Sequence, residues 1–189
     1  MSKHVSLTPA SENLLKMLVG TEITDVLGRD DRGRYNEETG RLEVTDVGLV
    51  AGNGQRILIW VRAFEIVPKL EGFLLEVTTS FDIRKWPGGP LVEWVSIAER
   101  IPGFARSRIK SVSVVESLYD KDSYYEDHVD HGLEATSVDE GLAIDLENGQ
   151  TFIVAASLEV PTVIELFWAD SKGVQDWSRG KKLRFLGTT

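Results

Sequence analysis

Residues 48–61 read GLVAGNGQRILIWV, in which one apolar stretch, an Asn-Gly pair and a second apolar stretch follow each other. Asn53-Gly54 predicts a tight β-hairpin, because both central residues of a type I′ turn need a positive φ. The strand after the turn, residues 57–61, is continuously apolar and rich in β-branched side chains. Such a composition is typical of a strand that is buried on both faces or nearly so.

The same pattern recurs in the second half of the chain. An Asn-Gly pair at 148–149 is preceded by a Gly-Leu pair at 141–142 and followed by an apolar strand at 152–156. The distance between the Gly-Leu and Asn-Gly pairs is two residues longer than in the first half. Two extra residues lengthen a strand without changing which face its side chains occupy.

Upstream of each hairpin the sequence predicts a helix, a glycine and a strand, with Gly20 and Gly103 at matching places. We therefore expect an α+β fold, mostly antiparallel β, made of two similar helix-strand-loop-hairpin-strand units packed together. The break at residues 86–90, WPGGP, is the best boundary. It divides the chain into a first unit, residues 1–86, and a second unit, residues 87–189, within one compact body.

Two helices are expected. Thr8 caps the first and Pro9 suits its first position, since the N–H that proline lacks would be unpaired there. The apolar residues of 91–101 recur at helical spacing and predict the second helix. Further strands are expected at 23–27, 73–79, 109–118, 142–146, 163–168 and 183–186, and a polar loop at 30–40.

The charge of the protein is concentrated in residues 116–147. This segment holds eleven acidic side chains and a single base, Lys121, so its formal charge is −10, against −9 for the whole chain. The acidic residues are Glu116, Asp120, Asp122, Glu126, Asp127, Asp130, Glu134, Asp139, Glu140, Asp145 and Glu147. In the repeat it corresponds to the loop before the first hairpin, so we expect an acidic loop.

Composition restricts the function classes further. The chain of 189 residues has no cysteine, so disulfides, thiolate zinc sites and cysteine nucleophiles are excluded. It has no run resembling a signal peptide or a membrane helix, and we expect a cytoplasmic protein that binds no membrane. The negative charge disfavours nucleic acid as a partner. A basic cluster at 179–184 is expected to be a solvated tail or an edge strand.

One constellation within the acidic loop suggests metal chemistry. His128 and His131 lie three residues apart among carboxylates. The alternative function is therefore a metal-binding protein or a hydrolase that uses these two histidines with the nearby carboxylates. The spacing is not that of a zinc metalloprotease, and the calcium-loop pattern from Asp120 lacks its glycine and glutamate. The third histidine, His4, is expected in a frayed terminus. We expect no enzyme and no cofactor.

An acidic loop that carries tyrosines favours protein binding. Tyrosine offers a large contact area at low entropic cost, and clustered charge speeds the encounter with an oppositely charged partner. The residues expected to contact the partner are Asp120, Asp122, Tyr124, Tyr125, Glu126, Asp127 and Asp130.

A small, cysteine-free, acidic α+β protein with such a loop resembles, in general type, the immunity proteins of bacterial toxin systems. The resemblance implies a non-enzymatic inhibitor that blocks a basic partner such as a toxin domain. We expect a monomer or a 1:1 heterocomplex. It rests on composition and on the character of the loop.

Overall fold

The computed structural model describes residues 3–29, 33–36, 41–67, 70–82, 84, 87–101, 103–119, 136–157 and 163–188. The expected class is confirmed: the protein is mostly antiparallel β-sheet with few helices. Among the described residues, no helix is long and apolar enough to cross a membrane.

The elements follow each other along the chain as β1 (Lys3–Val5), α1 (Pro9–Lys16), β2 (Glu22–Arg29), β3 (Arg34–Asn36), β4 (Arg41–Val44), β5 (Asp46–Ala51), β6 (Arg56–Val67), β7 (Leu70–Thr78), β8 (Trp94–Ser96), η1 (Ala98–Arg100), β9 (Ser107–Tyr119), β10 (Thr136–Leu146), β11 (Thr151–Ala156), β12 (Ile164–Ala169), α2 (Ser171–Trp177) and β13 (Lys182–Thr188).

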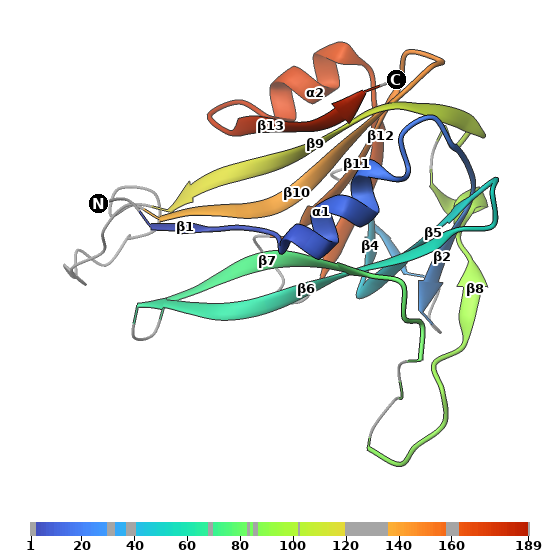
Figure 1. Cartoon of the computed structure of the whole chain (residues 1–189), viewed down its shortest axis with the longest axis horizontal. Coiled ribbons are helices and arrows are strands. Elements are labelled where there is room, and N and C mark those ends of the chain that lie inside the picture. Colours follow the sequence, from blue (N-terminus) through green and yellow to red (C-terminus); the bar gives the residue numbers. More distant parts are fainter. Residues whose placement is uncertain are drawn as a thin grey trace.

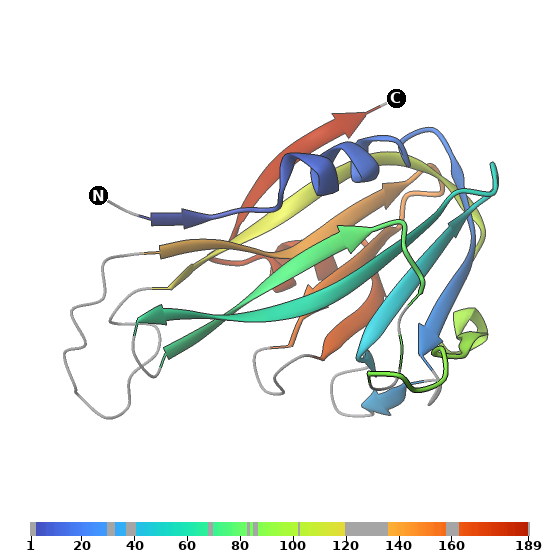
Figure 2. The ribbon, with the colours of Figure 1, turned by 60° about the horizontal axis from the view of Figure 1, so that its bottom comes forward.

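The described strands belong to one hydrogen-bonded sheet, in the order β3-β4-β12-β11-β10-β9-β2-β5-β6-β7. Three strands lie off this path: β1 pairs with β10 in parallel, β8 with β2, and β13 with β9. The sheet curls, so that the long β6–β7 hairpin lies opposite β9 and β10 (Figures 1 and 2). One apolar core fills the space between these two arms of the sheet.

Helix α1 lies between the two arms (Figure 1). Thr8 caps it as expected, with its Oγ1 accepting the N–H of Ser11 at 3.1 Å, and proline occupies the first turn. The Ser11 hydroxyl in turn donates to the carbonyl of Val77 in β7. Leu15 and Leu18 are fully buried in the core, so α1 closes the space between the arms.

The two Asn-Gly hairpins have the same backbone geometry. The N–H of Gly54 donates to Ala51 at 2.9 Å, and the N–H of Gly149 donates to Leu146 at 3.1 Å. In each turn the asparagine side chain accepts the N–H two residues on, at 2.9 and 3.0 Å. Both glycines have a positive φ, 82° and 83°, as expected for these positions. The expected type I′ turn is wrong, because these hydrogen bonds place Gly52-Asn53 and Glu147-Asn148 at the centres of the turns and each glycine directly after them.

The strand registers on either side of these hairpins also match. Ile23 pairs with Ala51 as Ile109 pairs with Leu146, and in each case a bulge follows. The pairs that follow were compared by counting residues from each turn. The pairing of β2 with β5 then matches that of β9 with β10, and the pairing of β5 with β6 matches that of β10 with β11. β2 and β9 also pair with each other antiparallel, with Glu22 opposite Arg108.

This register corrects one landmark of the sequence comparison. Counted from the Asn-Gly turns, Gly141 is the counterpart of Asp46 in β5, whereas the counterpart of Gly48 is Ala143. The Gly-Leu pairs therefore do not superpose, and the apparent two-residue insertion between them does not exist in the hairpin.

The helix expected at 91–101 is wrong. This stretch forms β8, which pairs with the end of β2, followed by the short 3-10 turn η1. Ile97 is fully buried against β2, where an added Cβ on Gly28 would lie only 2.8 Å from its side chain. This segment thus pairs with the open edge of β2. That tertiary pairing decides its conformation, although its apolar residues recur at helical spacing.

The loop expected at 30–40 contains a strand, β3, in its described part. β3 pairs with β4, and β4 pairs with the outer edge of β12 from the second half of the chain. The connection between β2 and β5 therefore crosses to the opposite end of the sheet order. Strand β1, helix α2 and strand β8 were not expected from the sequence.

The equivalence of the hairpins is testable through their glycines. Gly54→Ala and Gly149→Ala should each lower the free energy of unfolding by about 1–2 kcal/mol, because an L-residue is strained at positive φ. No atom lies within 4 Å of either added Cβ, so the backbone alone causes the loss. Urea unfolding measures it.

Gly52→Ala is the matched control for these variants. It lies in the same turn as Gly54, without a positive φ, and its added Cβ would be 3.5 Å from the nearest atom. It should change stability far less than Gly54→Ala. Strongly unequal losses for Gly54→Ala and Gly149→Ala would contradict the equivalence of the two turns.

Candidate functional site

The residues expected to bind a partner lie outside the described part of the chain. This holds for Asp120, Asp122, Tyr124, Tyr125, Glu126, Asp127 and Asp130, and for the alternative metal ligands His128 and His131. What the structure describes is the base of this segment. Tyr119 at the end of β9 is the register partner of Thr136 at the start of β10, so the segment leaves and re-enters the sheet at adjacent positions.

Three acidic residues of the 116–147 segment are buried in the strands of this base. Glu116 lies on β9, opposite Asp139 on β10, and Glu140 is the next residue along β10. The register shifts between Asp139 and Gly141, so a β-bulge occurs at this point. The contacts of Asp139 and Glu140 lie on different faces of the sheet, and each carboxylate finds its own set of partners.

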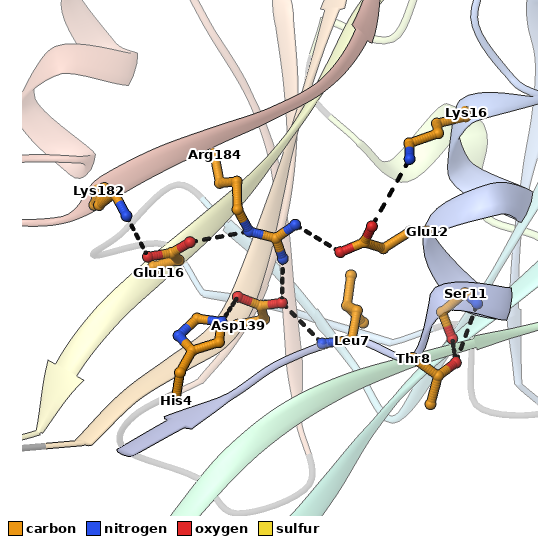
Figure 3. Close-up of polar contacts among 10 residues, drawn as sticks. All are labelled: His4, Leu7, Thr8, Ser11, Glu12, Lys16, Glu116, Asp139, Lys182 and Arg184. Atoms are coloured by element: carbon orange, nitrogen blue, oxygen red, sulfur yellow. Dashed lines mark hydrogen bonds and ion pairs between the residues drawn. The ribbon is translucent and has the colours of Figure 1, made fainter. Parts of the chain in front are cut away.

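Arg184 of β13 is the centre of the polar network on the α1 face of the sheet (Figure 3). Its Nε donates to Glu116 Oε1 at 3.0 Å, its Nη1 to Glu12 Oε1 at 2.6 Å and its Nη2 to Asp139 Oδ2 at 2.5 Å. Lys182 lies directly opposite Glu116 in the ladder and contacts Glu116 Oε2 at 3.2 Å. One guanidinium thus joins α1, β9, β10 and β13.

Glu140 is satisfied on the face covered by α2. Lys181 donates to Glu140 Oε1 at 2.8 Å, and the hydroxyl of Ser117 donates to the same oxygen. The Lys181 ammonium also lies 4.8 Å from the ring centre of Trp177, the last residue of α2. Lys181 therefore holds α2 and the bulge of β10 together.

Burial and charge move the pKa values of the two facing carboxylates in opposite directions. Burial raises the pKa of Asp139 above its usual value, against the opposing effects of the Leu7 N–H and of Arg184. Burial also acts to raise the pKa of Glu116, but Lys182, His4 and Arg184 together outweigh it, and the pKa lies below its usual value.

His4 joins this network from β1, so the expectation of a frayed terminus is wrong for residues 3–5. β1 runs parallel to β10, and the His4 ring contacts Ser137 through Nδ1 at 2.8 Å. Its Nε2 lies 3.5 Å from Asp139 Oδ1. Ligand atoms of His4, Glu116 and Asp139 lie within 4.8 Å of one another, a spacing that suits a metal ion.

The basic cluster at 179–184 was expected to be a solvated tail or an edge strand. Its second half is strand β13, and Lys181, Lys182 and Arg184 all pair with carboxylates of β9 or β10. The signal in the sequence was the presence of one strongly acidic and one basic segment in the same chain. Sequence reasoning considered each of them separately and missed their complementarity.

A second candidate site is an open cleft of about 650 Å³ on the outer side of the β5–β6–β7 part of the sheet. Its charged groups are paired: Arg29 contacts Asp46 at 3.1 Å, and Arg62 contacts Glu76 at 2.6 Å. Trp60 donates to Glu76 as well. These charged groups neutralise each other within the cleft. The cleft is therefore a weaker candidate for a functional site than the His4–Arg184 network.

Comparisons of this chain with protein-family models, with curated proteins and with solved structures found no match.

The central role of Arg184 is testable by its removal. Arg184→Met should lower the free energy of unfolding by about 3 kcal/mol, because it leaves the buried carboxylate of Asp139 without its cation. Lys182→Met is the control: its side chain is 75% exposed, and the loss should stay below about 1 kcal/mol. Equal losses would show that the network has no centre at Arg184.

The pH dependence of the same variant provides a second test. A raised native pKa means that stability is present below the unfolded pKa and is lost as the pH rises through the native pKa. Without Arg184 the pKa of Asp139 should rise further. The difference in unfolding free energy between wild type and Arg184→Met should therefore shrink from about pH 7 to about pH 4, and a pH-independent difference would contradict this account.

Proposed function

We propose that this protein is a non-enzymatic binding protein of the immunity type, which blocks a basic partner such as a toxin domain. The contacts would come from Asp120, Asp122, Tyr124, Tyr125, Glu126, Asp127 and Asp130. The proposal includes a cytoplasmic location and a monomer that forms a 1:1 complex with its partner.

The observation that carries the proposal is the division of the acidic segment into two parts. Glu116, Asp139 and Glu140 are buried in the sheet and paired with Lys181, Lys182 and Arg184. The residues between Tyr119 and Thr136 contain six further carboxylates and one lysine, a formal charge of −5. This charge belongs to a connection whose two ends are fixed side by side.

Such an arrangement suits an encounter with a positive surface. Clustered charge raises the association rate and disfavours wrong partners, and both effects weaken as salt increases. The network beneath the segment holds its two ends to β1 and β13, which limits the conformational entropy that a bound connection would lose.

The architecture of the body supports a further part of the proposal, an internal duplication. We infer two copies of a strand-loop-hairpin-strand unit, β2 to β7 and β9 to β12, packed on a common core. The matching hairpin hydrogen bonds and registers support this inference. The helix first expected in each unit is not part of it, because the described residues before β9 form no α-helix that matches α1, only the short 3-10 turn η1.

The binding proposal is tested by reversing charge within the segment. The triple variant Asp122→Lys, Glu126→Lys and Asp127→Lys should fold as the wild type does and lose at least tenfold in affinity for the partner. The candidate partner is the product of the gene adjacent to this one, purified separately. Circular dichroism checks folding, and titration calorimetry at low and high salt measures binding.

The matched control reverses three exposed carboxylates outside the segment, Asp82, Glu93 and Glu99. It makes the same change in net charge and should leave affinity nearly unchanged. Equal affinity for the wild type and the segment variant would exclude the segment as the contact. Growth arrest by the adjacent gene, relieved by co-expression of this protein, would identify the pair as toxin and inhibitor.

A further inference from the structure

We propose that His4, Glu116 and Asp139 bind a divalent cation of the zinc class. The three side chains come from β1, β9 and β10, and they meet at the base of the acidic segment (Figure 3). This site is distinct from His128 and His131 and does not depend on the proposed inhibitor function.

Asp139 provides the first argument. The residue is fully buried, and its Oδ2 accepts both the N–H of Leu7 and a guanidinium N–H of Arg184. Its Oδ1 is also buried but accepts no hydrogen bond. A buried carboxylate oxygen without a hydrogen bond is costly, and the imidazole Nε2 of His4 lies 3.5 Å from it.

The orientation of His4 provides the second argument. Its Nδ1 contacts the Ser137 hydroxyl at 2.8 Å. In the tautomer in which Nδ1–H donates to Ser137, Nε2 presents a lone pair to Asp139 Oδ1. Two lone pairs that face each other are favourable only with a positive charge between them, either a proton or a metal ion. A histidine that ligates a metal through one nitrogen commonly donates its other N–H in this way.

The distance between the two atoms fits a metal better than a shared proton. Nε2 and Oδ1 are 3.5 Å apart, beyond the about 2.7–2.9 Å of a charge-assisted hydrogen bond. Two ligands of a tetrahedral zinc ion, with bonds of about 2.0–2.2 Å, lie about 3.3–3.5 Å apart. His4 and Asp139 thus already stand at the separation that such an ion requires.

Of the two surrounding bases, Arg184 leaves the required oxygens free and only Lys182 would have to move for a cation to bind. Arg184 contacts Oδ2 of Asp139 and Oε1 of Glu116, so it uses the oxygens that the ion does not need. Lys182 contacts the other oxygen, Oε2 of Glu116, at 3.2 Å, but its side chain is 75% exposed and can move into solvent. A rotation of Glu116 toward His4 then completes three protein ligands.

The donor set selects the ion. One imidazole and two carboxylates suit zinc, and a fourth position would remain for water or a ligand. Calcium and magnesium prefer six or more oxygen ligands, which these three side chains do not supply. We therefore expect zinc to bind, and calcium and magnesium to leave the protein unchanged.

The test uses the full chain without a histidine tag, freed of metal by a chelator and dialysis. Titration calorimetry with zinc chloride should give one site per chain, and zinc should raise the melting temperature. His4→Ala should abolish that site. Ser137→Ala, which removes the hydroxyl that orients the ring, should weaken it about tenfold or more.

The double variant His128→Ala and His131→Ala serves as the control and should bind zinc with wild-type affinity. Circular dichroism verifies that each variant is folded; His4 is 40% exposed, so its replacement is tolerated by the core. Absence of zinc binding to the wild type would overturn the proposal. So would zinc binding that survives His4→Ala but is lost in the double variant, because the ion would then belong to the acidic segment.

Discussion

The structure depends on the burial of one carboxylate. Asp139 lies at a bulge of β10 with no solvent exposure, where an unpaired charge would cost several kcal/mol. Its compensation comes from Arg184 and from the backbone N–H of Leu7, that is, from the strand near the C-terminal end and the chain just after β1. Burying this group therefore fixes β1, β10 and β13 relative to one another.

This constraint also divides the negative charge of the protein into two classes. Glu116, Asp139 and Glu140 of the strands pair with the basic residues Lys181, Lys182 and Arg184 and hold the fold together. The carboxylates between Tyr119 and Thr136 lie outside the described residues and are the proposed contacts with a partner. The same network brings His4 to within 3.5 Å of Asp139, so one cluster both supports the acidic connection and offers a place for a metal ion.

The hairpins could be predicted from the sequence because a turn with positive φ is a local requirement, and Asn-Gly at 53–54 and 148–149 meets it. The structure of segment 91–101 could not be predicted, because it depends on pairing with β2, a tertiary contact. The helical spacing of apolar residues in this segment does not reveal that contact. The role of His4 depends on a partner more than a hundred residues away, and no spacing rule indicates it. Of the landmarks from which duplication was inferred, the turns and the strand starts at Ile23 and Ile109 correspond in the structure, whereas the helices and the Gly-Leu pairs do not.

The separation of Arg184 from Asp139 has a consequence for synthesis on the ribosome. The two residues are 45 positions apart, so the carboxylate is made well before the guanidinium that neutralises it. Until β13 has emerged, a nascent β9–β10 hairpin must keep Asp139 hydrated or protonated. The final packing of this face is therefore a late event, which awaits nearly the whole chain.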